Sequence, residues 1–119
     1  MNSALVLIIE TEIGKMDLVY TILMREGFSY GFARSREEAL KLIVTNAYDV
    51  VIMNYALVGM SVEEFLTRLG ELDSEINIIF TFSKSEARHT IESKHCKWLA
   101  MPCTADELLN LLPCEEGIL

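Results

Sequence analysis

The stretch Asp49–Met60, which reads DVVIMNYALVGM, decides the fold. Its apolar run Val50–Met53 ends on one polar residue, Asn54, and a loop that contains Gly59 follows. An apolar run that ends on a polar residue before a loop with glycine is typical of a strand end in an open parallel α/β sheet. Open α/β sheets place their functional groups beyond the carboxyl ends of such strands. The stretch therefore predicts a candidate site at Asn54.

Outward from this strand, short apolar runs alternate with helical patterns along the chain. The predicted strands are Leu5–Ile9, Tyr30–Ala33, Val50–Met53, Ile76–Phe80 and Trp98–Ala100. Strands that alternate with helices form a parallel sheet with right-handed crossovers. We expect an α/β doubly wound (βα)5 fold of the flavodoxin-like type, a three-layer sandwich with the sheet order 2-1-3-4-5. That order makes the first and third strands neighbours, so Glu10 and Thr11 are expected close to Asn54.

Helix boundaries are also marked in the sequence. Apolar residues recur at helical spacing from Ile13 to Leu23, before Gly27, a residue typical of a helix end. Four hydroxyl residues, each followed three positions later by Glu, predict helix starts through the capping-box pattern. These pairs are Ser35/Glu38, Ser61/Glu64, Ser83/Glu86 and Thr104/Glu107. Pro113 is expected to close the last helix after Leu112.

Length and composition limit the classes of protein that fit. A chain of 119 residues has the size of one domain. Its 18 acidic and 10 basic residues give a net charge of −8, so we expect no direct binding to nucleic acid or to an anionic membrane. No apolar run approaches the ~18 residues of a membrane span, and no signal peptide is recognisable. We expect a cytoplasmic domain with reduced cysteines, either alone or as the N-terminal module of a longer regulator.

Four landmarks together resemble the receiver (CheY-like) domain of two-component response regulators, over Ala4 to Leu112. They are LVLIIETE, DVVIMNYALVGM, INIIFTFS and KWLAMPCTADELL. In that family an acidic pair and an acceptor aspartate hold Mg²⁺, and the acceptor carboxylate attacks phosphorus. A Lys and a Thr or Ser hydroxyl stabilise the phosphoryl oxygens. The resemblance implies a signal-transduction domain rather than an enzyme.

The acceptor and metal positions of this family are altered here. The acceptor position falls on Asn54, whose amide is not a useful phosphoryl acceptor. The acidic pair falls on Glu10 and Thr11, which leaves at most one acid. We therefore expect no cofactor and no metal site, with weak Mg²⁺ binding at Glu10 and Asn54 as the less favoured alternative.

The positions that would steady a phosphoryl group are altered too. The lysine position falls on Met101, and the hydroxyl position falls on Phe82, or on Thr81 if the register shifts by one residue. Pro102 keeps the family's place after the lysine, where a cis peptide bond is common. Trp98 takes the place of the aromatic residue that moves with the hydroxyl in the family. We interpret the chain as a degenerate receiver, a pseudo-receiver that works independently of phosphorylation.

Plainer interpretations of the same residues stay open. Asn54 is either a polar cap without function or a residue that holds the loop. Glu10 and Glu12 are interpreted as solvated surface acids in preference to ligands. Phe82 and Met101 are expected to fill the space that the family's polar groups leave, since Met fills irregular gaps well.

The interpretation predicts a regulatory module that binds protein partners, and the face from Lys84 to Leu112 is expected to mediate dimerisation or control of a transcriptional output domain. The plain alternative is a solvated face. A second hypothesis is a Mg²⁺-dependent receiver with residual phosphoryl binding at the crevice of Glu10 and Asn54. A third is a small-ligand module of the flavodoxin-like fold. It ranks last because the first loop, ETEIGK, carries acids that repel phosphate.

Overall fold

The computed structural model describes residues 4–73, 75–83 and 95–113. The elements in chain order are β1 (Leu5–Ile9), a 3₁₀ helix η1 (Ile13–Met16), α1 (Asp17–Arg25), β2 (Ser29–Ala33), α2 (Arg36–Thr45), β3 (Val50–Asn54), α3 (Val62–Leu72), β4 (Asn77–Ser83), β5 (Cys96–Met101) and α4 (Ala105–Leu109). The strands form one parallel sheet in the order β2-β1-β3-β4-β5. The predicted fold class and strand order are confirmed.

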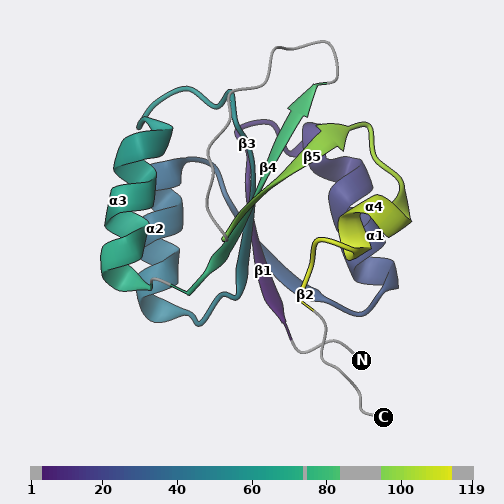
Figure 1. Cartoon of the computed structure of the whole chain (residues 1–119), viewed down its shortest axis with the longest axis horizontal. Coiled ribbons are helices and arrows are strands. Elements are labelled where there is room, and N and C mark those ends of the chain that lie inside the picture. The colour runs from purple at the N-terminus through teal and green to yellow at the C-terminus, as the bar shows by residue number, and fades with distance from the viewer. Residues whose placement is uncertain (1–3, 74, 84–94, 114–119) are drawn as a thin grey trace.

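The helices cover the two faces of the sheet in pairs. Figure 1 shows α1 and α4 on one face and α2 and α3 on the other. The central strands send alternate side chains to each face, with Ile8 and Ile52 in the core under α1, and Leu7 and Val51 in the core under α2 and α3. Because both faces are buried, β1 and β3 need apolar residues at every position, which is why their runs are continuous.

The register brings the carboxyl ends of four strands to one edge of the sheet. Ile9 of β1 pairs with Met53 of β3, and Asn54 pairs with Thr81 of β4. Ser83 at the end of β4 pairs with Met101 at the end of β5. The residues that follow these strands therefore meet at one place.

Most predicted helix starts are capped as expected. The side chains of Ser35, Ser61 and Thr104 each accept a hydrogen bond from the backbone N–H three residues later. At Thr104 the reciprocal bond from its backbone N–H to the Glu107 carboxylate completes the capping box. The pair Ser83/Glu86 cannot be followed, because Glu86 lies outside the described residues.

Gly27 ends α1, as predicted. It has a φ of +83°, in the left-handed region that glycine adopts without a steric cost. The N–H of Gly27 donates to the carbonyl of Met24, and the N–H of Phe28 donates to that of Leu23. This pair of bonds is the Schellman motif, which satisfies carbonyls that the end of a helix would leave open.

Some predicted boundaries are wrong by a few residues. The fourth strand is Asn77–Ser83 rather than Ile76–Phe80, and the fifth is Cys96–Met101 rather than Trp98–Ala100. Backbone pairing between these two strands continues through the polar residues Thr81 and Lys97, which interrupt the apolar runs, so the runs alone underestimate the length of both strands.

The first and last helices also differ from the prediction. The first begins as the 3₁₀ turn η1, and the last ends as an α-helix at Leu109 instead of reaching Leu112. Tight bonds from the N–H of Leu111 to Leu108 and from Leu112 to Leu109 continue the turn toward Pro113. Within the described ranges, no helix is long and apolar enough to cross a membrane.

Candidate functional site

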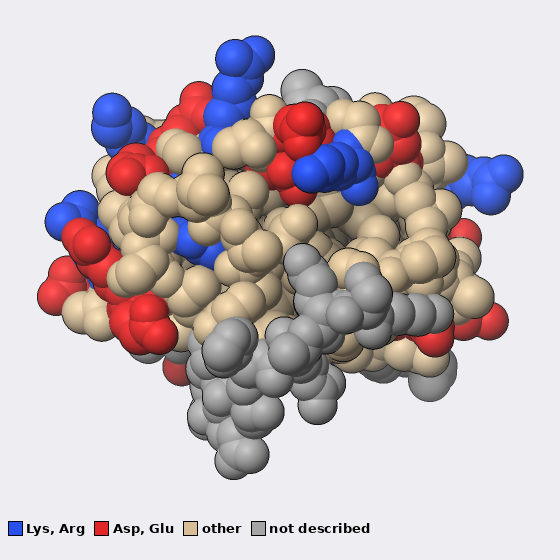
Figure 2. Space-filling model, turned by 90° about the horizontal axis from the view of Figure 1, so that it is seen from above, with Lys and Arg blue, Asp and Glu red and all other residues tan. Residues whose placement is uncertain are grey.

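A cleft of about 620 Å³ opens beyond the carboxyl ends of β1, β3, β4 and β5. Its lining residues are Glu10, Gly14, Lys15, Met16, Asp17, Leu18, Asn54, Thr81, Phe82, Ser83, Met101 and Pro102. Figure 2 views the molecule from above, onto this end of the sheet, and shows mostly uncharged surface with charged side chains along its borders. Of the predicted site residues, only Thr11 and Trp98 are absent from the lining. The topology therefore gathers the site that the sequence predicts.

Asn54 lies at the end of β3, and its side chain shapes the loop that follows. Its Oδ1 accepts a hydrogen bond from the backbone N–H of Ala56 at 2.9 Å. The Asn54 carbonyl accepts one from the N–H of Leu57 at 3.3 Å. An asparagine that bonds to the backbone two residues on forms an Asx turn. These bonds agree with the interpretation in which Asn54 holds the loop.

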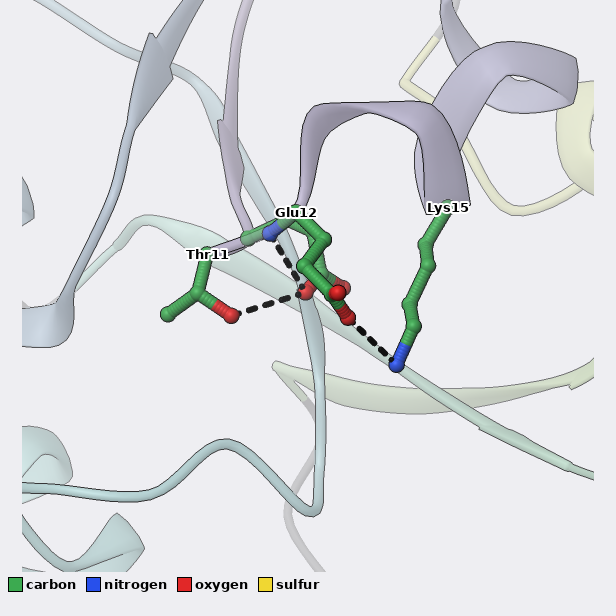
Figure 3. A network of polar contacts seen from close by, with 4 residues as sticks. Thr11, Glu12 and Lys15 are labelled. Atoms are coloured by element: carbon green, nitrogen blue, oxygen red, sulfur yellow. Dashed lines mark hydrogen bonds and ion pairs between the residues drawn. The ribbon is translucent and has the colours of Figure 1, made fainter.

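Glu10 is buried, with only 3% of its surface exposed, so the expectation that it is a solvated acid is wrong. Its backbone N–H donates to the carbonyl of Ala33 at 3.0 Å, which keeps the residue against the sheet after β1 ends. Its carboxylate accepts bonds from the N–H of Glu12 at 3.2 Å and from the hydroxyl of Thr11 at 3.4 Å. Glu12 itself is exposed, as expected, and its carboxylate pairs with Lys15 at 2.8 Å (Figure 3).

The two candidates for the hydroxyl position have different surroundings. Thr81 is buried and pairs directly with Asn54 across the sheet. Phe82 is half-buried, and its ring centroid lies 6.0 Å from that of Trp98. Trp98 packs on the α2–α3 side, 4.9 Å from the ring of Phe80 and 5.2 Å from that of Tyr55. Phe82 is thus the candidate that touches the aromatic position, while both candidates line the cleft.

Met101 forms part of the opposite wall. It is half-buried against the core under α1, and its peptide bond to Pro102 is cis. Phe82 and Met101 both line the cleft, yet the space between the walls stays open. The expectation that these two side chains fill the space left by the family's polar groups stays a prediction.

Sequence analysis missed two charged residues of the cleft, Lys15 and Asp17. They belong to the turn and helix that follow β1, and the order of the strands brings that segment to the same edge as Asn54. The hydroxyl of Tyr20 donates to Asp17, and this hydrogen bond raises the pKa of Tyr20. The signal was their place in the segment that follows the predicted strand end at Ile9.

Arg36, the first residue of α2, was missed entirely. It is 3% exposed, and its guanidinium donates to four backbone carbonyls of the loop after β3. The acceptors are Met60 at 2.7 Å, Leu57 at 3.1 Å, Tyr55 at 3.1 Å and Asn54 at 3.4 Å. Burial lowers the pKa of this guanidinium. The arginine thus ties the start of α2 to a loop about twenty residues further along the chain.

A signal for Arg36 was present in the helix pattern. The buried residues of α2 are Arg36, Ala39, Leu40 and Ile43, at the spacing of one helix face. An arginine on the apolar stripe of a helix needs acceptors for its donors in the interior. The pattern therefore predicts an internal partner, although it does not say which one.

The family model described as response regulator receiver domain matches residues 6–112. The transcriptional regulatory protein DltR of Streptococcus agalactiae is 28% identical over 106 residues, which are 87% of this chain and 47% of that protein. The chain thus spans about half the length of the curated relatives it matches.

Solved structures show the same fold. The response regulator protein TrrA of Thermotoga maritima, in complex with Mg²⁺-BeF, has a TM-score of 0.75 and 25% identity over 90% of this chain and 94% of that one. TrrA in complex with the histidine kinase ThkA has a TM-score of 0.73 at 25% identity, over 90% and 93%. A CheY-like receiver domain from Methanospirillum hungatei has a TM-score of 0.73 at 19% identity, over 90% and 89%.

Proposed function

The chain belongs to the response regulator receiver family of two-component signalling, and from this premise we propose that it is a signalling module that does not accept a phosphoryl group. The observation that carries the proposal is Asn54. It ends β3 in the cleft, at the family's acceptor position, and its Oδ1 already accepts the N–H of Ala56. A neutral amide lacks the carboxylate charge that makes an acceptor nucleophilic.

The residues around Asn54 do not fit a strong Mg²⁺ site. Mg²⁺ prefers six oxygen ligands in octahedral geometry, with carboxylates among them. The altered acidic pair leaves Glu10, whose carboxylate already accepts bonds from Thr11 and Glu12. In the described ranges, no three His, Cys, Asp or Glu residues are grouped so that they would hold a metal ion. The proposed function therefore involves no metal ion.

The walls of the cleft support the same proposal. A transferred phosphoryl group carries negative charge that needs a cation and hydroxyl donors around it. Met101 places a thioether where the family has a lysine, and Phe82 places a ring beside Trp98. The chain is thus a module without a catalytic role of its own.

The partners of the module are proteins. TrrA is a relative solved in complex with a histidine kinase, and DltR is a transcriptional regulatory protein. By analogy, the chain controls a partner or an output domain, with transcription as the output. The face from residue 84 to 112 is the site of a homodimer, although residues 84–94 lie outside the described part. Its described exposed charges include Asp106 and Glu107 of α4.

Sedimentation equilibrium over a range of concentrations tests the dimer. Asp106→Lys adds a positive charge to a face that already carries Lys97 and is expected to weaken self-association, since like charges across an interface repel. Glu71→Lys, on an exposed position of α3, is the matched control. If the wild-type chain stays monomeric at all concentrations, the proposed dimer is refuted and the rest of the proposal stands.

A second candidate function is residual phosphoryl binding that depends on Mg²⁺. The observation in its favour is that the cleft remains open at about 620 Å³ with the buried Glu10 in its wall. Amide NMR with Mg²⁺ and beryllium fluoride separates the two. The first proposal expects an unchanged spectrum, and shifts clustered at Glu10, Asn54 and Phe82 would establish the second.

Mass spectrometry after incubation with acetyl phosphate and Mg²⁺ tests phosphoryl transfer directly. We expect no phosphoryl group on the wild type or on Asn54→Asp alone, because Thr11 and Met101 remain. The triple variant Thr11→Asp, Asn54→Asp and Met101→Lys restores the acid, the acceptor and the cation together. It is expected to gain one phosphoryl group, and a gain on the unaltered chain would refute the proposal.

A further inference from the structure

One buried side chain holds both ends of the loop between β3 and α3. The Nη1 group of Arg36 donates to the carbonyl of Met60 at 2.7 Å, at the far end of the loop, and to that of Leu57 at 3.1 Å, in the middle of the loop. Its Nη2 group donates to the carbonyls of Tyr55 at 3.1 Å and Asn54 at 3.4 Å, at the near end. The four acceptors converge on one rigid, planar group, since the guanidinium presents its donors in a fixed fork.

The buried positive charge of Arg36 is stabilised by these four carbonyls. The side chain is 3% exposed, and no ion pair joins it to an acid within the described ranges. Its Nε–H has no acceptor there either. A buried cation is unfavourable unless polar groups surround it. The loop carbonyls are therefore the groups that compensate the charge, and the loop conformation that supplies them is favoured.

We propose that Arg36 is a positioning residue that locks the loop from Tyr55 to Met60 in one conformation. The proposal rests on the proposed function, because a loop that is held from inside the protein keeps its shape without a bound ligand. The domain then presents a constant surface at this edge and does not alternate between two. Arg36 acts through the loop and touches no reacting atom.

The bonding pattern explains why the loop has one conformation. Withdrawing the loop breaks the bonds from Arg36 to Tyr55, Leu57 and Met60 and leaves a buried charge short of acceptors. Tyr55 adds a second attachment on the same side, with its ring centroid 5.5 Å from Phe80 and 5.2 Å from Trp98. A movement of the loop would have to break both attachments together.

Amide hydrogen exchange in the full chain tests the lock. The reporters are the N–H groups of Ala56 and Leu57, which bond to Asn54. In Arg36→Met we expect both to exchange at least tenfold faster, beyond any acceleration of the β1 amides, which report global opening. Arg68→Met, at an exposed arginine of α3, is the matched control and should leave the loop amides unchanged. Equal acceleration of loop and β1 amides, or none, overturns the proposal.

Arg36→Lys keeps the test decisive if Arg36→Met does not fold. An ammonium keeps the charge but lacks the planar fork, so it reaches fewer of the four carbonyls. Relaxation dispersion should show μs–ms exchange at Tyr55–Met60 in this variant and none in the wild type. If relaxation dispersion shows no μs–ms exchange in the loop of Arg36→Lys, as in the wild type, the proposal is overturned.

The two proposals fail separately. A phosphoryl group on the wild type removes the proposed function, whatever the loop amides do. If the exchange rates of the loop amides do not change in Arg36→Met and the chain is not phosphorylated, only the proposed role of Arg36 is refuted. The mass measurement and the exchange measurement thus report on different claims.

Discussion

The loop after Asn54 has two unlike sides. On its α2 side, Arg36 donates to four loop carbonyls, and Tyr55 packs with Phe80 and Trp98. On its cleft side, the carboxyl ends of the strands border an open space of about 620 Å³. The α2 side of the loop is therefore held by many specific contacts, while its cleft side borders a space that is open to solvent.

The difference shows where the fold keeps its specific contacts. The cleft side is lined by an amide and a thioether, at Asn54 and Met101, which under the proposed function stand where receivers carry their chemistry. The α2 side instead carries a buried charge with matched acceptors, an arrangement that is costly unless complete. The contacts that fix the loop thus lie opposite the cleft, which suits a domain whose surfaces matter more than its cleft.

Two phenylalanines of β4 offer the largest test of this comparison. Phe80 is fully buried on the α2 side, whereas Phe82, two residues on, is half-buried at the cleft. Phe80→Ala is expected to lower the free energy of unfolding by about 3–5 kcal/mol, through lost burial and a residual cavity. Phe82→Ala should lower it by only about 1 kcal/mol. Urea unfolding measures both, and equal losses would contradict the contrast between the two sides.

Removal of the Arg36 guanidinium is expected to have the next largest effect. Arg36→Met leaves four carbonyls without their donor, and we expect a loss of about 2–3 kcal/mol in the free energy of unfolding. Arg68→Met breaks only the exposed pair with Glu64, which is worth about 0.5 kcal/mol or less. Thermal and urea unfolding of the two variants measure the difference. Similar losses of unfolding free energy in Arg36→Met and Arg68→Met would mean that the buried hydrogen bonds of Arg36 stabilise the fold no more than an exposed ion pair does.

The architecture could be predicted from the sequence because it depends on local patterns. The short apolar runs favour strands, and their alternation with helices indicates a parallel sheet, for which 2-1-3-4-5 is the expected order at this length. The ends of β4 and β5 were harder to predict, because the polar residues Thr81 and Lys97 interrupt the apolar runs while the backbone pairing continues through them.

The site was predictable only in part. Asn54, Glu10 and Met101 were placed correctly at one cleft, since strand order alone brings them together. The burial of Glu10 and the role of Arg36 were not seen, because each depends on contacts between segments distant in sequence. Arg36 in particular resembles an ordinary charged residue at a helix start, until its place on the buried face of α2 is considered.

The Asx turn of Asn54 provides a smaller test, at the boundary between the two sides. Asn54→Ala removes the acceptor of the Ala56 N–H, and a single hydrogen bond of this kind contributes about 1 kcal/mol. Asn54→Asp keeps an acceptor oxygen and should preserve slow exchange of the Ala56 amide. Loss of protection in the alanine variant alone supports the turn. Unchanged protection in both would mean that Arg36 fixes the loop without help from Asn54.

The smallest expected effect is a pH dependence of stability that comes from Tyr20 of α1. The hydrogen bond to Asp17 raises the pKa of Tyr20 above its ordinary value. A group whose pKa is raised on folding stabilises the folded state below its unfolded pKa, about 10 for tyrosine, and loses that contribution as the pH rises through the folded pKa.

Alkaline solution should therefore weaken the wild type slightly more than Tyr20→Phe, which has no proton to lose. Asp17→Asn should return the titration of Tyr20, followed by tyrosinate absorbance, toward the ordinary value, while Asp106→Asn on α4 should not. Because Tyr20 belongs to the helix beside the cleft, its titration should leave the exchange of the Ala56 and Leu57 amides unchanged. Coupling of these amides to Tyr20 would mean that the cleft side still communicates with the loop, and the separation of the two sides would fail.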